Sequence, residues 1–71
     1  MRLIEKKILR LLWNKSISEG DLYINSFGNF MGYSKDSFTI LLCKLEEQGL
    51  ICSYLNSNTK FWRIKDNNNE I

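Results

Sequence analysis

Apolar residues change their spacing at Gly49, and this change does most to limit what the chain can fold into. Before Gly49 they recur three and four positions apart, which places them on one face of a helix. After Gly49 they alternate with polar residues, which is the period of a half-buried strand. The chain has 71 residues, of which 44% are hydrophobic, so it has room for one core. The pattern predicts a small α+β domain, mostly helical, over residues 1–65 and a disordered polar tail over residues 66–71.

Three amphipathic helices are expected before Gly49, with Ile17 as a very short strand between the first two. The helices are predicted over residues 3–13, about 19–31 and about 35–48. Their apolar residues form three stripes: Ile4, Ile8, Leu11 and Leu12; Tyr23, Ile24, Phe27, Phe30 and Met31; and Phe38, Leu41, Leu42 and Leu45. Each stripe has the width that a helix buries against a core.

Serines and glycines mark where the second and third helices begin and end. Ser18 and Ser34 are suited to cap the two N-termini, because a serine hydroxyl accepts a hydrogen bond from a free backbone N–H. Gly32 and Gly49 are expected to end the same two helices, since glycine adopts positive φ without strain.

A β-hairpin is expected after Gly49. Its strands are predicted over residues 50–55 and 60–65, and a four-residue turn of Asn, Ser and Thr joins them. Trp62 and Ile64 stand at alternate positions of the second strand, so both are predicted to lie in the core.

Basic residues cluster at both ends of an acidic middle. Five basic residues and one acidic residue give residues 1–15 a net charge of +4, whereas residues 16–49 carry −3 and residues 50–65 carry +3. The predicted first helix and hairpin are therefore the parts of the chain best suited to contact phosphate groups.

The chain is not expected to be an enzyme, because it has no histidine, no nucleophile motif and no glycine-rich phosphate loop. No cofactor is expected. Without histidine, Cys43 and Cys52 are too few for a tetrahedral metal site, so no metal is expected and both are predicted to be reduced, partly buried thiols. The longest apolar run, residues 40–43, is far shorter than the roughly 20 residues of a membrane span.

The first residues mix charged and apolar side chains and do not form a secretion signal. A cytoplasmic protein without a membrane partner is therefore expected. The chain has no Ala, Val or Pro but eight Asn and eight Ile, a bias of AT-rich genomes. This bias suits a viral or plasmid protein, which would act inside its host cell.

The stretch FGNFMGYSKDSFTILL, residues 27–42, resembles the helix-turn-helix signature of transcription regulators. Gly28 stands where that motif has a small residue between its helices, and Gly32 stands where its turn needs positive φ. The motif's apolar positions match Phe27, Met31, Tyr33, Phe38 and Leu41. LEEQGLI, residues 45–51, is similar to the junction between the third helix and the wing in winged-helix regulators. Residues 3–65 thus resemble a winged helix-turn-helix domain, a three-helix core with a C-terminal β-hairpin wing.

The resemblance implies a sequence-specific, repressor-like regulator that binds double-stranded DNA. In that family the third helix reads bases in the major groove, while the wing contacts the DNA backbone. The positions implied to read bases are Lys35, Asp36, Thr39 and Ile40. Those implied to contact phosphates are Ser37 and Lys44 in the third helix and Asn58, Lys60 and Arg63 in the wing.

Leu9 and Trp13 fall outside the buried stripe of the first helix. Either the wing or the C-terminal tail covers them, or they form the contact of a homodimer that reads an inverted repeat. The alternative function is a winged-helix module that binds a host or replication protein. It follows from a third helix that lacks arginine and whose outer face includes Ile40, Cys43 and acidic residues. The fold alone does not choose between these functions.

Overall fold

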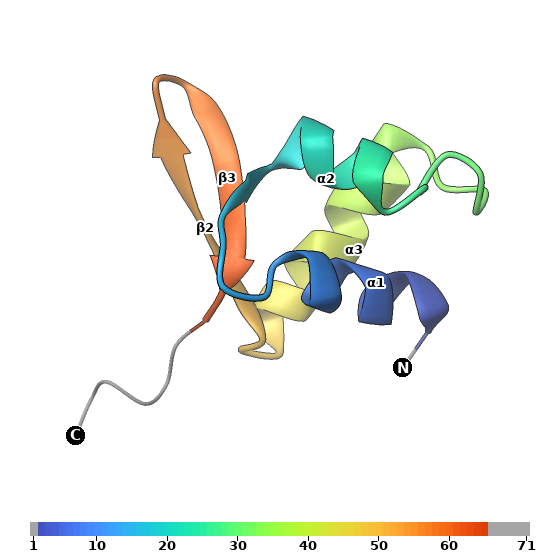
Figure 1. Cartoon of the computed structure of the whole chain (residues 1–71). Coiled ribbons are helices and arrows are strands. Elements are labelled where there is room, and N and C mark those ends of the chain that lie inside the picture. The colour runs from blue at the N-terminus through green and yellow to red at the C-terminus, as the bar shows by residue number, and fades with distance from the viewer. Residues whose placement is uncertain (1, 66–71) are drawn as a thin grey trace.

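The computed structural model describes residues 2–65, which form three helices on one side of a small sheet (Figure 1). The helices are α1 (Leu3–Leu11), α2 (Glu19–Asn25) and α3 (Lys35–Glu47), and the strands are β1 (Ile17–Ser18), β2 (Ile51–Asn56) and β3 (Thr59–Ile64). The predicted α+β class, with a short strand after the first helix and a C-terminal hairpin, is confirmed. The predicted tail, residues 66–71, lies outside the described residues. Within residues 2–65, every helix is too short or too polar to cross a lipid bilayer.

The strands form an antiparallel sheet in the order β1, β3, β2. Trp62 of β3 lies opposite Ile17 of β1 and opposite Ser53 of β2. The hairpin turns at Ser57 and Asn58, whose φ angles are 52° and 66°. Two central residues with positive φ form a primed turn, whose twist matches that of the paired strands. The predicted four-residue turn is therefore wrong, because strand pairing continues one residue further on each side of the turn.

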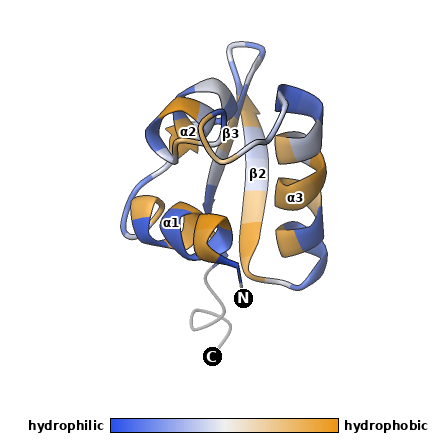
Figure 2. Ribbon diagram, turned by 90° about the vertical axis from the view of Figure 1, so that its right-hand side faces the viewer, coloured by the Kyte–Doolittle hydropathy of each residue, from blue (hydrophilic) through white to orange (hydrophobic). Residues whose placement is uncertain are grey.

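The core lies between the helices and the inner face of the sheet. Its buried side chains are Ile4, Ile8, Leu12, Leu22, Phe38, Leu41, Leu42, Leu45, Ile51 and Trp62. The predicted stripe of α3 and the burial of Trp62 are confirmed, and Ile64 is half-buried against the same core. In α1, Leu11 is half-buried and the other stripe residues are buried as predicted. Figure 2 shows that β2 is hydrophobic at its start and more polar toward the hairpin tip, so the tip extends beyond the core.

Helix α2 is shorter than predicted. It ends at Asn25 in a Schellman motif, in which the Gly28 N–H donates to the Tyr23 carbonyl and the Phe27 N–H donates to the Ile24 carbonyl. Phe27 occupies the left-handed position of this motif, with a φ of 59°. Glycine is the usual residue at that position, so the positions of the glycines in the sequence do not indicate this helix end.

The early end of α2 changes which side chains are buried. The predicted stripe is wrong for three of its five residues, whereas Tyr23 and Met31 are half-buried against the core. Leu22 and Ser26 are fully buried, whereas Ile24, Phe27 and Phe30 are 67%, 51% and 85% exposed. The chain after α2 forms turns rather than helix, so residues expected on one helical arc do not share a face.

Both predicted N-caps are confirmed. The hydroxyls of Ser18 and Ser34 each accept a hydrogen bond from the backbone N–H three residues further on, at 3.3 and 3.1 Å. Gly49 follows α3 with a φ of 80°, as predicted. Gly32 has the expected positive φ, 87°, but it closes the turns that follow α2 rather than the helix itself. Helix α1 ends two residues earlier than predicted, where the chain turns toward Asn14, whose φ is 65°.

Candidate nucleic-acid interface

Helix α3 exposes three sides, because the core covers only the side that carries Phe38, Leu41 and Leu45. By helical periodicity, the outer stripe opposite the core consists of Asp36, Ile40, Cys43 and Glu47. Ile40 is 57% exposed, and Cys43 is a half-buried free thiol, as predicted. The outer stripe therefore offers two carboxylates and no cation to a partner.

The flank of α3 that faces α2 carries Lys35 and Thr39. Thr39 is half-buried, and its hydroxyl lies within hydrogen-bond distance of the Glu19 carboxylate and of the Lys35 carbonyl. The four positions predicted to read bases thus point in different directions. Asp36 and Ile40 lie on the outer stripe, Lys35 lies beside α2, and Thr39 is turned into contact with α2.

The Glu19 carboxylate connects three elements of the fold. It belongs to the first residue of α2, one of its oxygens accepts the Trp62 indole N–H at 2.9 Å, and the other accepts the Thr39 hydroxyl. A buried indole N–H needs an acceptor, and Glu19 supplies it. The sequence did not point to this role, because only the pairing of Ile17 with Trp62 brings position 19 beside the indole. Among the described residues, no buried side-chain nitrogen or oxygen lacks a hydrogen-bond partner.

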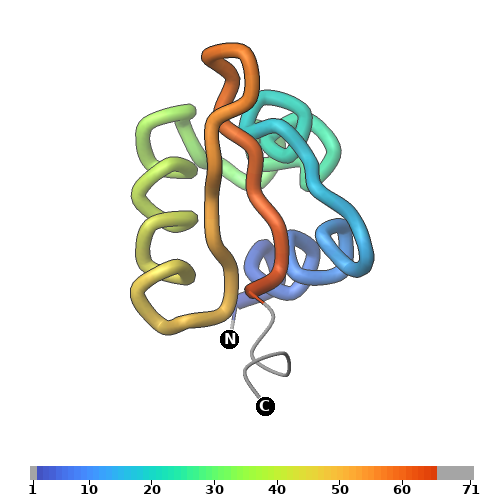
Figure 3. The backbone as a smooth tube through the Cα atoms, turned by 90° about the vertical axis from the view of Figure 1, so that its left-hand side faces the viewer, coloured from blue at the N-terminus to red at the C-terminus, as the bar shows by residue number. Residues whose placement is uncertain are grey.

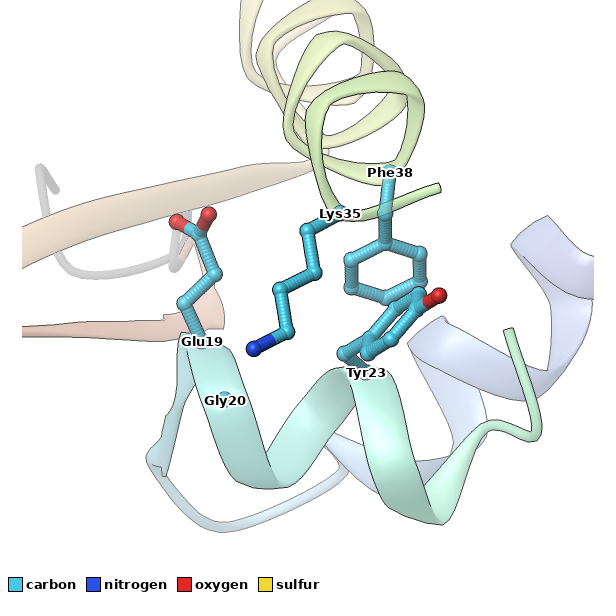
Figure 4. Close-up of a pocket in the computed structure, with 5 residues that line it drawn as sticks. All are labelled: Glu19, Gly20, Tyr23, Lys35 and Phe38. Carbon is cyan, nitrogen blue, oxygen red and sulfur yellow. The ribbon is translucent and has the colours of Figure 1, made fainter. Parts of the chain in front are cut away.

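Lys35 lies beside a hollow of about 230 Å³ between the first turns of α2 and α3. Figure 4 shows its side chain extending from α3 toward Gly20 of α2, with Glu19 on one side. The rings of Tyr23 and Phe38 close the other side edge to face, with centroids 5.1 Å apart. Lys35 is thus an exposed cation in the first turn of α3, beside the start of α2.

The opposite flank of α3 carries Ser37 and Lys44, the two helix residues predicted to contact phosphates. Both line a second hollow, of about 360 Å³, together with Arg2 and Tyr33. The Arg2 side chain, at the start of α1, donates to the Tyr33 hydroxyl at 3.0 Å. The sequence placed Arg2 only in the basic N-terminal segment and Tyr33 only at an apolar position of the motif. It did not join them, because they are 31 positions apart. Each flank of α3 therefore carries a lysine, Lys35 on one side and Lys44 on the other.

The hairpin tip lies at the same end of the molecule as the N-terminus of α3 (Figures 1 and 3). Asn58 is exposed in the turn, and the Lys60 ammonium lies 5.0 Å from the centre of the Trp62 ring. Arg63 points to the other face of the sheet from Lys60, because side chains alternate between the faces along a strand. The fold brings Asn58 and Lys60 toward the end where α3 begins and leaves Arg63 on the outer face of the hairpin.

Leu9 and Trp13, the predicted dimer contact, differ in their exposure. Leu9 is half-buried and packs against the core, whereas Trp13 is 70% exposed. The wing belongs to the described part of the chain, so the alternative prediction that the wing covers Trp13 is wrong. Trp13 is therefore the member of this pair with apolar surface to offer.

Comparison with known proteins does not identify a family: no protein-family model matches the chain, and no curated protein matches it.

Proposed function

We propose that the chain is a winged-helix protein that binds double-stranded DNA, with α3 in the major groove and the hairpin against the backbone. The observation that carries this proposal is that the hairpin tip and the N-terminus of α3 lie at the same end of the molecule (Figure 3). Lys35 is the first residue of α3, Asn58 lies in the hairpin turn and Lys60 lies close to that turn. A duplex that meets this end would contact the helix and the hairpin together. The order of the elements, with a hairpin directly after the third helix, supports the same layout.

The charges around α3 fit a helix that lies in a groove. The major groove of B-DNA is about 12 Å wide and admits one helix, so a phosphate backbone runs along each flank of that helix. Lys35 lies on one flank of α3 and Lys44 lies on the other. Lys44 would oppose a phosphate on its flank, whereas Lys35, in the first turn of α3, would reach a base edge. Both cations would also offset the carboxylates of the outer stripe, which would face base edges rather than phosphates.

The outer stripe offers base contacts of two kinds. Ile40 is exposed and apolar, so it can pack on a thymine methyl group. Asp36 can accept a hydrogen bond from cytosine N4. These contacts favour sequence-specific binding, and a protein bound at such a site would exclude polymerase by its bulk. Repression of transcription is therefore the regulatory outcome that we infer.

Two lysine substitutions test the proposal. Lys35→Ala is expected to weaken binding to the specific site by about 1 to 3 kcal/mol, because it removes a base contact. Lys60→Ala is expected to weaken binding to all DNA sequences alike, because it removes a phosphate contact. It should also lower the slope of log affinity against log salt by about one. Fluorescence anisotropy measures both effects, with the DNA upstream of this chain's gene and a scrambled duplex at about 50 and 200 mM salt.

Lys15→Ala is the matched control, because it removes the same charge from the exposed connector after α1. It is expected to change the affinity much less than Lys60→Ala. Equal binding of the wild type to both duplexes would contradict sequence-specific recognition. No binding to either duplex would contradict the proposal as a whole.

A protein-interaction module is the second candidate function, and two exposed aromatic rings favour it. The rings of Phe27 and Phe30 have centroids 6.2 Å apart, and the Lys7 ammonium lies 5.5 Å from the centre of the Phe27 ring. Large apolar side chains that gather at a surface mark contact sites. Ile40 is a separate exposed apolar residue, on the outer stripe of α3. Either surface would bind a host or replication protein in place of DNA.

A homodimer is part of the DNA-binding proposal. Trp13 supplies exposed apolar surface after α1, with Leu9 at its edge, and two copies joined there would present two α3 helices to an inverted repeat. Trp13→Ala is expected to convert a dimer into a monomer in solution, as measured by analytical ultracentrifugation. An unchanged dimer mass would place the interface elsewhere, and a monomeric wild type would remove the dimer from the proposal.

A further inference from the structure

A hollow between the start of α1 and the flank of α3 gathers hydrogen-bonding groups from separate parts of the chain. Its volume is about 360 Å³, and its polar lining consists of Arg2, Glu5, Tyr33, Ser37, Lys44 and Gln48. Arg2, Ser37 and Lys44 are exposed, so a ligand can reach the hollow from solvent.

Two hydroxyl groups in the hollow retain protons to donate. The Arg2 guanidinium donates to the Tyr33 hydroxyl oxygen at 3.0 Å, which leaves the Tyr33 O–H proton for another acceptor. The Ser34 hydroxyl donates to the Ser37 hydroxyl oxygen at 3.0 Å, which leaves the Ser37 proton in the same way. The guanidinium also has further N–H groups beyond the one that contacts Tyr33.

The charges of the hollow favour an anion. Arg2 and Lys44 are cations, and Glu5 is the one acidic group among the lining residues. The Glu5 carboxylate accepts the Arg2 backbone N–H at 2.7 Å, so it is already engaged at the start of α1. The hydrogen bond to Tyr33 raises the pKa of the Arg2 guanidinium, and any guanidinium is already protonated throughout the working pH range.

We propose that this hollow binds a phosphate group, with Arg2 and Lys44 opposing its charge and the hydroxyls of Tyr33 and Ser37 donating to its oxygens. A guanidinium is suited to this task because its planar set of donors matches the oxygens of a phosphate. Ser37 and Lys44 belong to α3, so the group would be a phosphodiester of the strand that runs along this flank. That assignment rests on the proposed function. Inorganic phosphate has the same chemistry, and the experiment separates the two sources.

Two measurements on the full chain test the proposal. In the first, inorganic phosphate is titrated into ¹⁵N-labelled protein, with chloride at matched ionic strength as the reference. The wild type is expected to show saturable, phosphate-specific shifts of the Tyr33 and Ser37 amides. In the second, duplex affinity is measured as a function of salt. The double variant Arg2→Gln/Lys44→Gln is expected to lose the amide shifts and to lower the salt slope by about one to two.

Lys6→Gln/Lys15→Gln is the matched control, because it removes two exposed cations that do not line the hollow. This control is expected to keep the phosphate shifts and most of the salt slope. Tyr33→Phe keeps the charge and removes one donor, so it is expected to weaken the phosphate shifts several-fold while the circular dichroism spectrum stays unchanged.

The outcomes separate the subsite from the proposed function. Loss of the amide shifts and a lower salt slope in the double variant, but not in the control, would support the subsite. Equal salt slopes in the double variant and the control, with duplex binding intact, would overturn the subsite and leave DNA binding in place. Phosphate shifts that vanish in the double variant, without any duplex binding, would keep the subsite for free phosphate and overturn the DNA assignment.

Discussion

Trp62→Ala is expected to remove a large part of the protein's stability. Trp62 is the largest fully buried side chain, and truncation of such a residue costs about 3 to 5 kcal/mol. A domain of this length has a free energy of unfolding of about 4 to 11 kcal/mol. The variant also removes the indole N–H that donates to Glu19 at 2.9 Å, so that carboxylate loses a partner. Urea unfolding followed by circular dichroism measures the loss.

Leu55→Ala is the control for this substitution, because it truncates a side chain that is 73% exposed. Its effect is expected to stay within about 0.5 kcal/mol. A Trp62→Ala protein within about 1 kcal/mol of the wild type would contradict the packing of the sheet on the helices, since core truncations of this size cost more.

Gly28→Ala is expected to destabilise the protein by about 1 to 3 kcal/mol, because it overpacks a close contact. A Cβ atom at this position would lie 2.8 Å from two ring carbons of Tyr23 and 3.3 Å from a ring carbon of Phe38. The Tyr23 ring is held at its far end, where its hydroxyl donates to the Tyr33 carbonyl. It also packs edge to face on Phe38, so it cannot move aside freely.

Gly20→Ala is the matched control, because a Cβ atom there would meet no heavy atom within 4 Å. Gly20 lies in α2, and alanine favours the helical backbone, so this variant is expected to be as stable as the wild type or up to about 1 kcal/mol more stable. Thermal unfolding of the two variants should therefore show shifts in different directions. A Gly28→Ala protein as stable as the wild type would mean that the Tyr23 ring shifts at no cost.

The sequence predicted α3 well because the signals that define it are local. Ser34 caps the helix, Gly49 follows its end, and the buried stripe repeats at helical spacing between them. The end of α2 has no such signal. It depends on Phe27 adopting a left-handed backbone conformation. That conformation costs a residue other than glycine roughly 1 to 2 kcal/mol, and nothing in the sequence indicates it.

In the candidate interface, too, residues in a local pattern were predicted, and contacts between distant parts of the chain were missed. Ser37 and Lys44 were predicted as phosphate contacts from the resemblance of a local stretch to the helix-turn-helix motif, and both line the hollow on one flank of α3. Arg2 was missed because its contact with Tyr33 spans 31 positions. Thr39 was predicted to read bases, but its hydroxyl is engaged by Glu19 across the fold. Contacts between elements depend on tertiary packing, and one sequence does not carry that information.

The Glu19 carboxylate has a consequence for the thermodynamics of any partner that touches both α3 and the hairpin. Its hydrogen bonds to Trp62 and Thr39 join the hairpin to α3 before a partner arrives. Such a partner does not have to restrict a hinge between the two surfaces, so this part of the conformational entropy is lost during folding rather than during binding. The distance between α3 and the hairpin is therefore fixed before binding. A partner whose two contact sites lie at a different distance would have to deform to reach both.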